Sequence, residues 1–161
     1  MATAPARAYV GLGANLGDGA ATLRQVLAEL RDTEGVLAVT ASPFYRSAPV
    51  EATGPDFVNA VAALDTRLAP LALLDALQAL ENRHGRQRPY KNAPRTLDLD
   101  LLLYGDTAMA HERLSLPHPR MHQRAFVLLP LRDLAPDLML QGRRLDDWLG
   151  EIHDQAIARV A

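Results

Sequence analysis

The stretch "APRTLDLDLLLYG", residues 93–105, places two aspartates within one of the most apolar runs of the chain. The alternation of leucine with Asp98 and Asp100 predicts a β-strand beginning at residue 96. Side chains two residues apart in a strand share a face, so the two carboxylates are expected to point together. One face of this strand would hold Thr96, Asp98, Asp100, Leu102 and Tyr104, and the other Leu97, Leu99, Leu101 and Leu103.

The segments before this strand follow a regular order. Strands are predicted at residues 7–13, 36–47 and 56–66, and helices at residues 23–35 and 70–85. A glycine turn is expected to end the first strand. With the strand at residues 96–105, the order becomes β-α-β-β-α-β, the split β-α-β pattern of ferredoxin-like folds. We therefore predict an α+β fold, with an antiparallel sheet that carries both helices on one face.

The remainder of the chain adds C-terminal elements to this core. Residues 113–131 are typical of a short strand, a proline-bracketed turn and an apolar segment, and residues 145–160 predict a closing helix. A length of 161 residues suits one domain, so residues 1–161 are interpreted as a single domain.

Composition restricts the class of protein. The chain is 48% hydrophobic and 22% charged, which is typical of a soluble globular protein. It has no window long enough for a membrane span and no apolar signal region, so we expect a cytoplasmic location. The absence of cysteine excludes disulfides, thiolate metal ligands and a thiol nucleophile.

The charge is unevenly distributed along the chain. Residues 83–95 carry five of the 17 lysines and arginines and no acidic residue. The rest of the chain has 12 basic against 19 acidic residues, although the net charge of the whole chain is only −2. A basic loop on an acidic protein favours a small anionic ligand over a long nucleic acid.

The aspartate pair next to this basic loop indicates phosphate chemistry. Two carboxylates about 6 Å apart repel each other by roughly 2–3 kcal/mol at an effective dielectric near 20. Shared divalent cations would remove that cost, and carboxylate ligation suits Mg²⁺ bound to substrate phosphates. An exposed strand face with two unrelated acids is the alternative. The cations that would complete such a site are Arg86, Arg88, Lys91 and Arg95.

Common nucleotide and metal motifs are absent. In "GLGANLGD" the glycines are spaced one residue too far apart for a dinucleotide fingerprint, and no Walker lysine follows. These glycines are better explained by a tight turn and close backbone packing. His118 and His122 lack the glutamate of a zinc-protease motif, and Pro119 follows the first, so a zinc site is not expected.

Six ordered blocks nevertheless resemble the 6-hydroxymethyl-7,8-dihydropterin pyrophosphokinase family of folate biosynthesis. The similarity covers residues 9 to about 138 and is strongest at the aspartate strand. The blocks are "YVGLGANLGD", "SPFYRSAPV", "DFVNAVAAL", "LQALENRHGRQR", "PRTLDLDLLLYG" and "LPHPRMHQRAFVLLPL".

The resemblance implies a specific reaction and its cofactors. Such an enzyme is a ferredoxin-like monomer with extra C-terminal elements, and it uses two Mg²⁺ ions. It transfers the β,γ-pyrophosphoryl unit of ATP to the hydroxymethyl group of the pterin and releases AMP. Asp98 and Asp100 match the metal-binding pair, while Arg86 and Arg95 match the arginines that act on the triphosphate.

The resemblance also assigns substrate contacts. The residues expected to bind ATP are Gln78, Glu81, Arg86, Arg88, Lys91, Arg95, Leu101, Ser115, His118 and Arg124. The residues expected to bind the pterin are Ser47, Ala48, Val50, Phe57, Asn59, Asp98 and Phe126. In this assignment Phe57 and Phe126 enclose the flat ring, which suits aromatic stacking, and Asn59 offers both a donor and an acceptor to its polar edge. From the sequence alone, core packing of both rings and a solvent-facing Asn59 are the alternatives.

The sequence departs from the family pattern without losing a metal ligand. An aromatic-glycine pair before Pro94 is Asn92-Ala93 here, and the loop is one residue shorter. A family tyrosine is Phe57, a Thr-Pro pair is Ser47-Ala48, and an aromatic after His118 is Pro119. Lys91 is a candidate replacement for a missing arginine.

Two other functions fit parts of the sequence. A ferredoxin-like nucleic-acid-binding module could use the basic loop at residues 83–95, but only 5% of residues are aromatic and no strand has an RNA-binding aromatic run. A small metal-dependent phosphohydrolase could use the same acids and arginines. Pterin binding would distinguish the pyrophosphokinase from both, so the partners expected here are ATP and the pterin, with no nucleic acid and no membrane.

Overall fold

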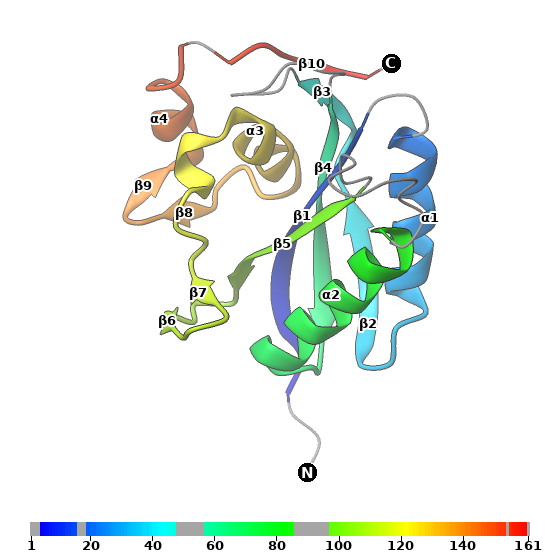
Figure 1. The fold of residues 1–161 in the computed structure, drawn as a ribbon. Coiled ribbons are helices and arrows are strands. Elements are labelled where there is room, and N and C mark those ends of the chain that lie inside the picture. Colours follow the sequence, from blue (N-terminus) through cyan, green and yellow to red (C-terminus); the bar gives the residue numbers. More distant parts are fainter. Residues whose placement is uncertain (1–3, 16–18, 48–56, 86–96, 154, 161) are drawn as a thin grey trace.

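A central antiparallel sheet with helices on both sides organises the chain (Figure 1). The computed structural model describes all residues except 1–3, 16–18, 48–56, 86–96, 154 and 161. The first part contains β1 (Ala6–Asn15), α1 (Gly19–Arg31), β2 (Val36–Ala41), β3 (Tyr45–Ser47), β4 (Phe57–Thr66), α2 (Pro70–Gly85) and β5 (Asp98–Tyr104). The second contains β6 (Met109–Ala110), β7 (Ser115–Leu116), the 3₁₀ helix η1 (Met121–Gln123), α3 (Ala125–Leu134), β8 (Met139–Leu140), β9 (Arg143–Arg144), α4 (Leu145–Leu149) and β10 (Ile157–Arg159).

The strand order confirms the predicted ferredoxin-like topology. The main sheet has the strand order β10-β3-β4-β1-β5. Strand β3 pairs with the first residues of β4, and β2 pairs with its last residues. The predicted strand at residues 36–47 is thus two strands that pair with β4 in succession. Pro43 interrupts it because proline has no backbone N–H to donate. Ser42 maintains the contact: its N–H donates to the Val61 carbonyl at 2.8 Å, and its hydroxyl accepts the Val61 N–H at 3.0 Å.

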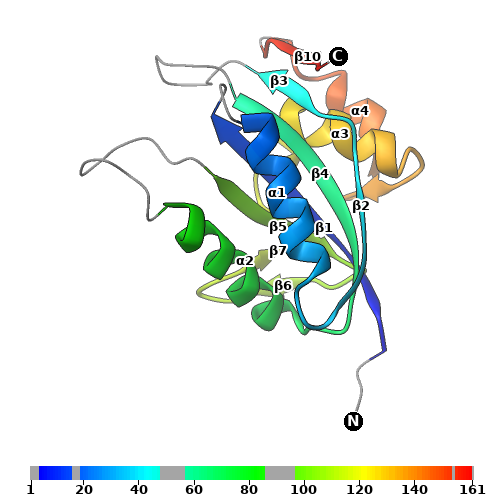
Figure 2. The ribbon, with the colours of Figure 1, turned by 90° about the vertical axis from the view of Figure 1, so that its right-hand side faces the viewer.

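The first two helices cover one face of the sheet, as predicted (Figure 2). The apolar stripe of α1, which includes Leu23 and Leu27, is buried there, as are Leu73 and Leu77 of α2. They pack against strand residues of that face such as Leu12, and together they form the main hydrophobic core. Burial of this continuous apolar surface is the dominant stabilising contribution to such a fold.

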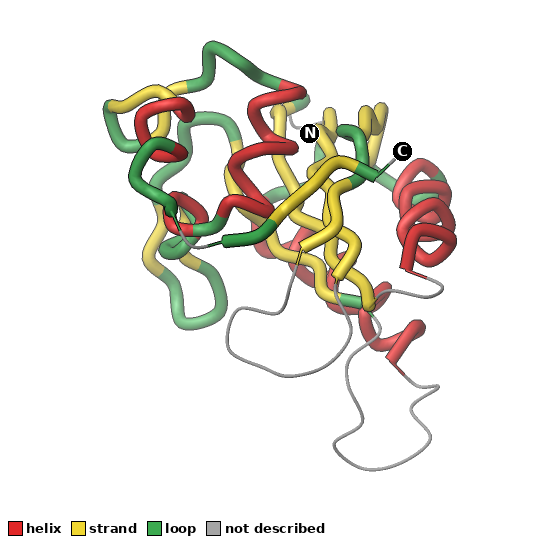
Figure 3. Tube along the Cα trace, turned by 90° about the horizontal axis from the view of Figure 1, so that it is seen from above, coloured by secondary structure: helices red, strands yellow, loops and turns green. Residues whose placement is uncertain are grey.

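The C-terminal elements pack on the opposite face, so the sheet lies between two helical layers when seen from above (Figure 3). Leu128 and Leu131 of α3 and Leu145 of α4 form a second buried cluster with Val61 and Leu102 of the sheet. Within the part of the chain that the structure describes, no helix could span a membrane.

Strand β5 contains an irregularity that the sequence did not predict. Its pairing with β1 shifts between Tyr9 and Val10, which face Leu103 and Leu101 respectively, so Leu102 is an extra residue in the ladder. After this bulge, Leu102 and Leu103 contact the C-terminal cluster and Tyr104 joins the main core. The predicted placement of Leu103 and Tyr104 is therefore wrong, since a bulge reverses the alternation of side chains beyond it.

The predicted closing helix at residues 145–160 is only partly correct. The helix ends at Leu149, and the last described residues form β10, which pairs with the edge strand β3. Ile157 faces Ser47 in this pairing, and the Val160 N–H donates to the Phe44 carbonyl at 2.8 Å. An open strand edge offers unpaired backbone groups, and the chain end satisfies them.

Candidate active site

A cavity of about 830 Å³ lies between the sheet and the segment formed by η1 and α3. It is on the sheet face opposite to α1 and α2, and the strands β1, β3, β4 and β5 all contribute residues to it. Seven of the residues predicted for the site line this cavity together: Ser47, Phe57, Asn59, Asp98, Asp100, Arg124 and Phe126.

Two glycines of β1 form the floor of the cavity. Gly11 and Gly13 lie within β1, so the glycine turn predicted at these two positions is wrong, while Gly17 lies outside the described residues. The predicted close packing holds for Gly13 alone, since a Cβ atom on Gly11 would make an ordinary contact of 3.5 Å with the Leu102 side chain. A Cβ atom on Gly13 would lie 3.2 Å from Oδ1 of Asn59, tighter than ordinary side-chain packing allows. Because alternate residues share a strand face, two glycines here remove two side chains from the middle of the floor.

The two aspartates stand at the β5 side of this floor. In the ladder Asp98 faces Gly13 and Asp100 faces Gly11, and both carboxylates line the cavity while remaining half-exposed. The predicted common orientation of the pair is therefore confirmed. Nη1 of Arg124 lies 3.9 Å from Oδ2 of Asp100, close enough for a weak, partly solvated ion pair.

This acid pair suits a metal that keeps other ligands. Among the described residues no group of three or more histidines and acids could hold a metal ion. Mg²⁺ is typically bound by one or two carboxylates, with water and substrate phosphates completing its octahedral shell. Two half-exposed carboxylates on a cavity wall fit that ligand set, whereas an all-protein zinc or calcium site does not.

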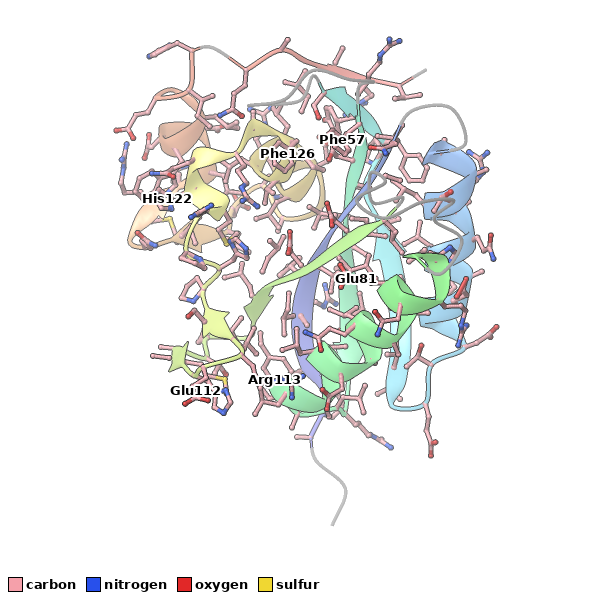
Figure 4. The ribbon with its side chains drawn as sticks, viewed as in Figure 1. Phe57, Glu81, Glu112, Arg113, His122 and Phe126 are labelled. Carbon is pink, nitrogen blue, oxygen red and sulfur yellow. The ribbon has the colours of Figure 1, made fainter. Side chains whose placement is uncertain are left out.

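The other side of the floor carries rings and a buried amide. Phe57 of β4 and Phe126 of α3 lie at the same end of the sheet and both line the cavity (Figure 4). Asn59 is 5% exposed, so the alternative of a solvent-facing asparagine is wrong. Its Nδ2 donates to Oγ of Ser47 at 2.5 Å, which fixes the amide with Oδ1 near Gly13.

His118 lies just before η1 and close to Asp100 of the acid pair. Its backbone N–H donates to the Leu102 carbonyl at 2.9 Å, and its Nδ1 accepts the Arg120 N–H at 3.1 Å. Burial lowers the pKa of His118 below its ordinary value. The Asp100 carboxylate opposes this shift, whereas Arg124 and Arg120 add to it. The ring is thus neutral near pH 7, with its proton on Nε2.

Five of the described residues predicted to bind ATP do not line this cavity: His118, and four residues around α2, β5 and β7. Oε2 of Glu81 accepts the Leu99 N–H at 2.8 Å, and Oε1 of Gln78 accepts from Arg113 at 3.1 Å (Figure 4). Leu101 is buried in the main core and Ser115 is exposed on β7. Arg113 also contacts Asp75, so the β6–β7 turn is tied to α2. Because Leu99 lies between Asp98 and Asp100, its bond to Glu81 fixes the backbone between the two aspartates.

The remaining predicted residues lie outside the described part of the chain. These are Ala48 and Val50 of the pterin set and Arg86, Arg88, Lys91 and Arg95 of the basic loop. Cavity residues flank both segments: Ser47 and Phe57 lie on either side of residues 48–56, and Asp98 comes two residues after residues 86–96.

Several cavity residues were not predicted for the site. Gly11 and Gly13 had a detectable signal, because glycines at alternate positions of a strand leave a gap on one face. Arg120, Gln123 and Gln155 also line the cavity. They had no comparable signal, because polar residues in the loops around a sheet are ordinary surface residues.

Comparisons with known proteins agree with this geometry. The family model described as "7,8-dihydro-6-hydroxymethylpterin-pyrophosphokinase (HPPK)" matches residues 9–136. The 2-amino-4-hydroxy-6-hydroxymethyldihydropteridine pyrophosphokinase of Pseudomonas aeruginosa is 48% identical over 156 residues, which cover 96% of both chains. The protein of the same name from Haemophilus influenzae is 45% identical over 139 residues, or 86% of this chain and 87% of that one.

Solved structures share the fold. A crystal structure of Plasmodium falciparum HPPK-DHPS with pterin and p-hydroxybenzoate gives a TM-score of 0.72 at 14% identity. The match covers 92% of this chain and 43% of that one, so this chain spans less than half the length of the solved protein. At this identity the likeness concerns the fold alone. Neither the family match nor these relatives support the alternative of a nucleic-acid-binding module.

Proposed function

The chain belongs to the 7,8-dihydro-6-hydroxymethylpterin-pyrophosphokinase family, and we infer that it transfers pyrophosphate from ATP to 6-hydroxymethyl-7,8-dihydropterin in folate biosynthesis. The hydroxymethyl oxygen bonds to the β-phosphorus as the bond from that phosphorus to the oxygen bridging the α-phosphorus breaks. The products are AMP, the pterin diphosphate and the proton of the hydroxyl group. The observation that carries the inference for this chain is a cavity that contains the acid pair, both rings and the buried amide together.

We propose that the pterin lies over the glycine floor, between the rings of Phe57 and Phe126. Stacking a flat heteroaromatic ring on each would contribute about 0.5–1.5 kcal/mol beyond burial. Asn59 would recognise the polar edge, and its bond to Ser47 supports this role because it holds the amide in one orientation. Ala48 and Val50 would add backbone contacts.

The acid pair would hold the metal ions of the reaction. We propose that Asp98 and Asp100 bind two Mg²⁺ ions, each completed by phosphate oxygens and water. Bound there, Mg²⁺ would neutralise the charge of the triphosphate and lower the pKa of the attacking hydroxyl group. Arg124 already faces Asp100 at 3.9 Å, so its guanidinium is available to a phosphate near that carboxylate.

The other charged residues would position ATP. Arg86 and Arg95 would bind the triphosphate and stabilise charge in the transition state, with Arg88 and Lys91 as further phosphate contacts. His118 would contribute its Nε2–H as a neutral donor, since Nδ1 is already occupied by the Arg120 N–H. The contacts proposed along β5 and α2 come from Gln78, Glu81, Leu101 and Ser115.

The same proposal covers the organisation of the molecule. We propose that residues 1–161 work as one domain and as a monomer in the cytoplasm. The main sheet supports a single domain, because it contains both β1 and β10.

The identity of the products tests the proposed reaction. The purified protein would be incubated with ATP and 6-hydroxymethyl-7,8-dihydropterin, and the products would be measured by mass spectrometry. We expect equal amounts of AMP and pterin diphosphate, and loss of both when Mg²⁺ is chelated. A 6-methyl pterin, which lacks the hydroxyl group, is the matched control and should give no AMP. Formation of ADP and a pterin monophosphate, or ATP hydrolysis that ignores the pterin, would contradict the proposal.

A further inference from the structure

Gln155 lies where the C-terminal segment crosses the start of α3. Its Oε1 accepts the Ala125 N–H at 2.9 Å, and its Nε2 donates to the Gln123 carbonyl at 2.8 Å. The two bonds reach the backbone on either side of Arg124. One side-chain amide therefore closes a clamp around a single residue, in the manner of a strand pairing with its neighbour.

The clamped residue is the N-cap of α3. Arg124 has extended dihedral angles, φ −119° and ψ 108°, between the 3₁₀ helix and α3, and no side chain of its own caps the helix. The first N–H groups of a helix have no partner within it, and serine, threonine, aspartate or asparagine usually provides one at the N-cap. Here Gln155 bonds the first of them, that of Ala125. A guanidinium has no acceptor and cannot cap these N–H groups, so the cap comes from Gln155 while the Arg124 side chain lines the cavity.

Two proposed substrate contacts project from this short segment. Nη1 of Arg124 reaches 3.9 Å from Asp100, and its Cζ lies 5.6 Å from the ring centroid of Phe126. Both side chains line the cavity. Their direction depends on the backbone angles at residue 124, because its extended conformation separates the 3₁₀ helix from α3. A clamp on its flanking peptide groups therefore controls both.

The clamp is anchored to the opposite wall of the cavity. Two residues beyond Gln155, Ile157 pairs with Ser47 of β3, the residue that holds the Asn59 amide. Farther along the strand, Arg159 donates to Asp133 of α3 at 3.2 Å. The C-terminal segment thus connects β3, next to Asn59, to α3, which carries Phe126.

We propose that Gln155 is a positioning residue that sets the spacing between the two walls of the substrate cavity by fixing Arg124 and Phe126. This inference rests on the proposed function, because it assumes that these two side chains contact substrate. Gln155 itself is not expected to bind substrate through its amide, since both of its polar atoms already bond backbone groups. It lies beyond residues 9–136, which the family model matches.

Two substitutions separate the halves of the clamp. Gln155→Met keeps the length of the side chain and removes both bonds, while Gln155→Glu keeps the acceptor for the Ala125 N–H and loses the donor to Gln123. For Gln155→Met we expect kcat/KM for the pterin to fall about tenfold, below the roughly hundredfold loss that a 1 Å displacement can cause. Gln155→Glu should lose less. The exposed Gln25→Met on α1 is the matched control and should behave as wild type.

A second measurement does not depend on activity. Hydrogen exchange of the Ala125 amide should accelerate in Gln155→Met and stay slow in Gln155→Glu, because only the latter retains its acceptor. Pterin binding should weaken in Gln155→Met even where thermal unfolding shows that the protein is folded. If Gln155→Met does not fold, weaker pterin binding by folded Gln155→Glu supports the proposal, and unchanged binding overturns it.

The variant Phe126→Ala separates this proposal from the proposed function. If Phe126→Ala weakens pterin binding while both Gln155 variants keep wild-type kinetics, the clamp is structural and the positioning role is wrong. If Phe126→Ala leaves pterin binding unchanged, the proposed pterin site is itself wrong, and the role of Gln155 falls with it. Weaker binding in Phe126→Ala and in Gln155→Met supports both.

Discussion

The two faces of the central sheet differ in what they bury. The face under α1 and α2 is continuous apolar surface, filled by residues such as Leu12, Leu64 and Leu99. The face toward α3 has two halves. Around Val61 and Leu102 it is apolar and packs against α3 and α4, while the other half is a cavity with a glycine floor, two carboxylates and a buried amide. One face therefore supplies the stability that the other gives up, since hollows and like charges are both unfavourable in a folded protein.

The boundary between these roles runs through single strands. In β5, Asp98 and Asp100 line the cavity, while Leu99 and Leu101 are buried in the main core. Neighbouring residues of one strand thus belong to different functions. Substitution of neighbours is the sharpest way to test whether the two faces are separable.

The largest effect is expected from the acid pair. Asp98→Ala should lower kcat by about 10²–10³-fold, the range found when one electrostatic contact to a reacting centre is removed. The free energy of unfolding should change by no more than about 1 kcal/mol, because the contacts of a half-exposed carboxylate contribute little and its repulsion with Asp100 is also lost. Steady-state kinetics over a range of Mg²⁺ concentrations and denaturant unfolding would measure both quantities.

The neighbouring Leu99→Ala is the matched control on the other face. Leu99 is 4% exposed in the main core, so its truncation should cost about 2–5 kcal/mol of unfolding free energy. The folded fraction should keep a kcat near that of wild type. A stable but inactive Leu99→Ala, or an unfolded Asp98→Ala, would show that the two faces are not separable.

The glycine floor should give an intermediate effect. Gly13→Val would place a branched side chain in the cavity, with its Cβ 3.2 Å from Oδ1 of Asn59. We expect KM for the pterin to rise by about tenfold, while the free energy of unfolding changes little because the strand preference of valine offsets the strain of the close contact with Asn59. Titration with the pterin, followed by fluorescence, and thermal unfolding would measure the two effects.

Val10→Ala, three residues earlier and on the core face, is the paired control, because Val10 is fully buried in the main core. It should destabilise the fold and leave KM for the pterin unchanged in the folded fraction. Equal KM values for Gly13→Val and wild type would mean that the pterin does not lie over this floor.

Much of this separation could be predicted from the sequence. Alternation around Asp98 and Asp100 was sufficient to place them on one face, because a charged residue between leucines gives a clear period of two. The bulge at Leu102 could not be predicted, since Leu101, Leu102 and Leu103 are equally apolar and have no period. The family resemblance, rather than periodicity, identified Phe57 and Phe126 as site residues, because a ring at a strand end usually belongs to the core.

Long-range polar contacts were beyond prediction. The side-chain amide of Gln155 bonds the backbone of Ala125, which lies 30 positions earlier in the sequence, and that of Gln123, which lies 32 positions earlier. The bond from the Val61 N–H to the Ser42 hydroxyl, which takes the place of a backbone acceptor, is another contact of this kind. Such bonds depend on where tertiary packing brings a chain segment, and no local pattern encodes them.

The smallest effect concerns the pH dependence of stability, which should depend on the cavity face through His118. Burial is the largest cause of its lowered pKa, with Asp100 opposing the shift and the nearby arginines adding to it. The unfolded chain then binds a proton more readily than the folded protein between the lowered pKa and the ordinary 6.5. Stability should therefore be free of this penalty above pH 6.5 and should fall as the pH drops through the window below it. Denaturant unfolding of wild type and His118→Gln from pH 5 to 8 would measure the difference. We expect the wild-type curve to be steeper only below pH 6.5; parallel curves would mean that the buried His118 ring does not contribute to acid destabilisation.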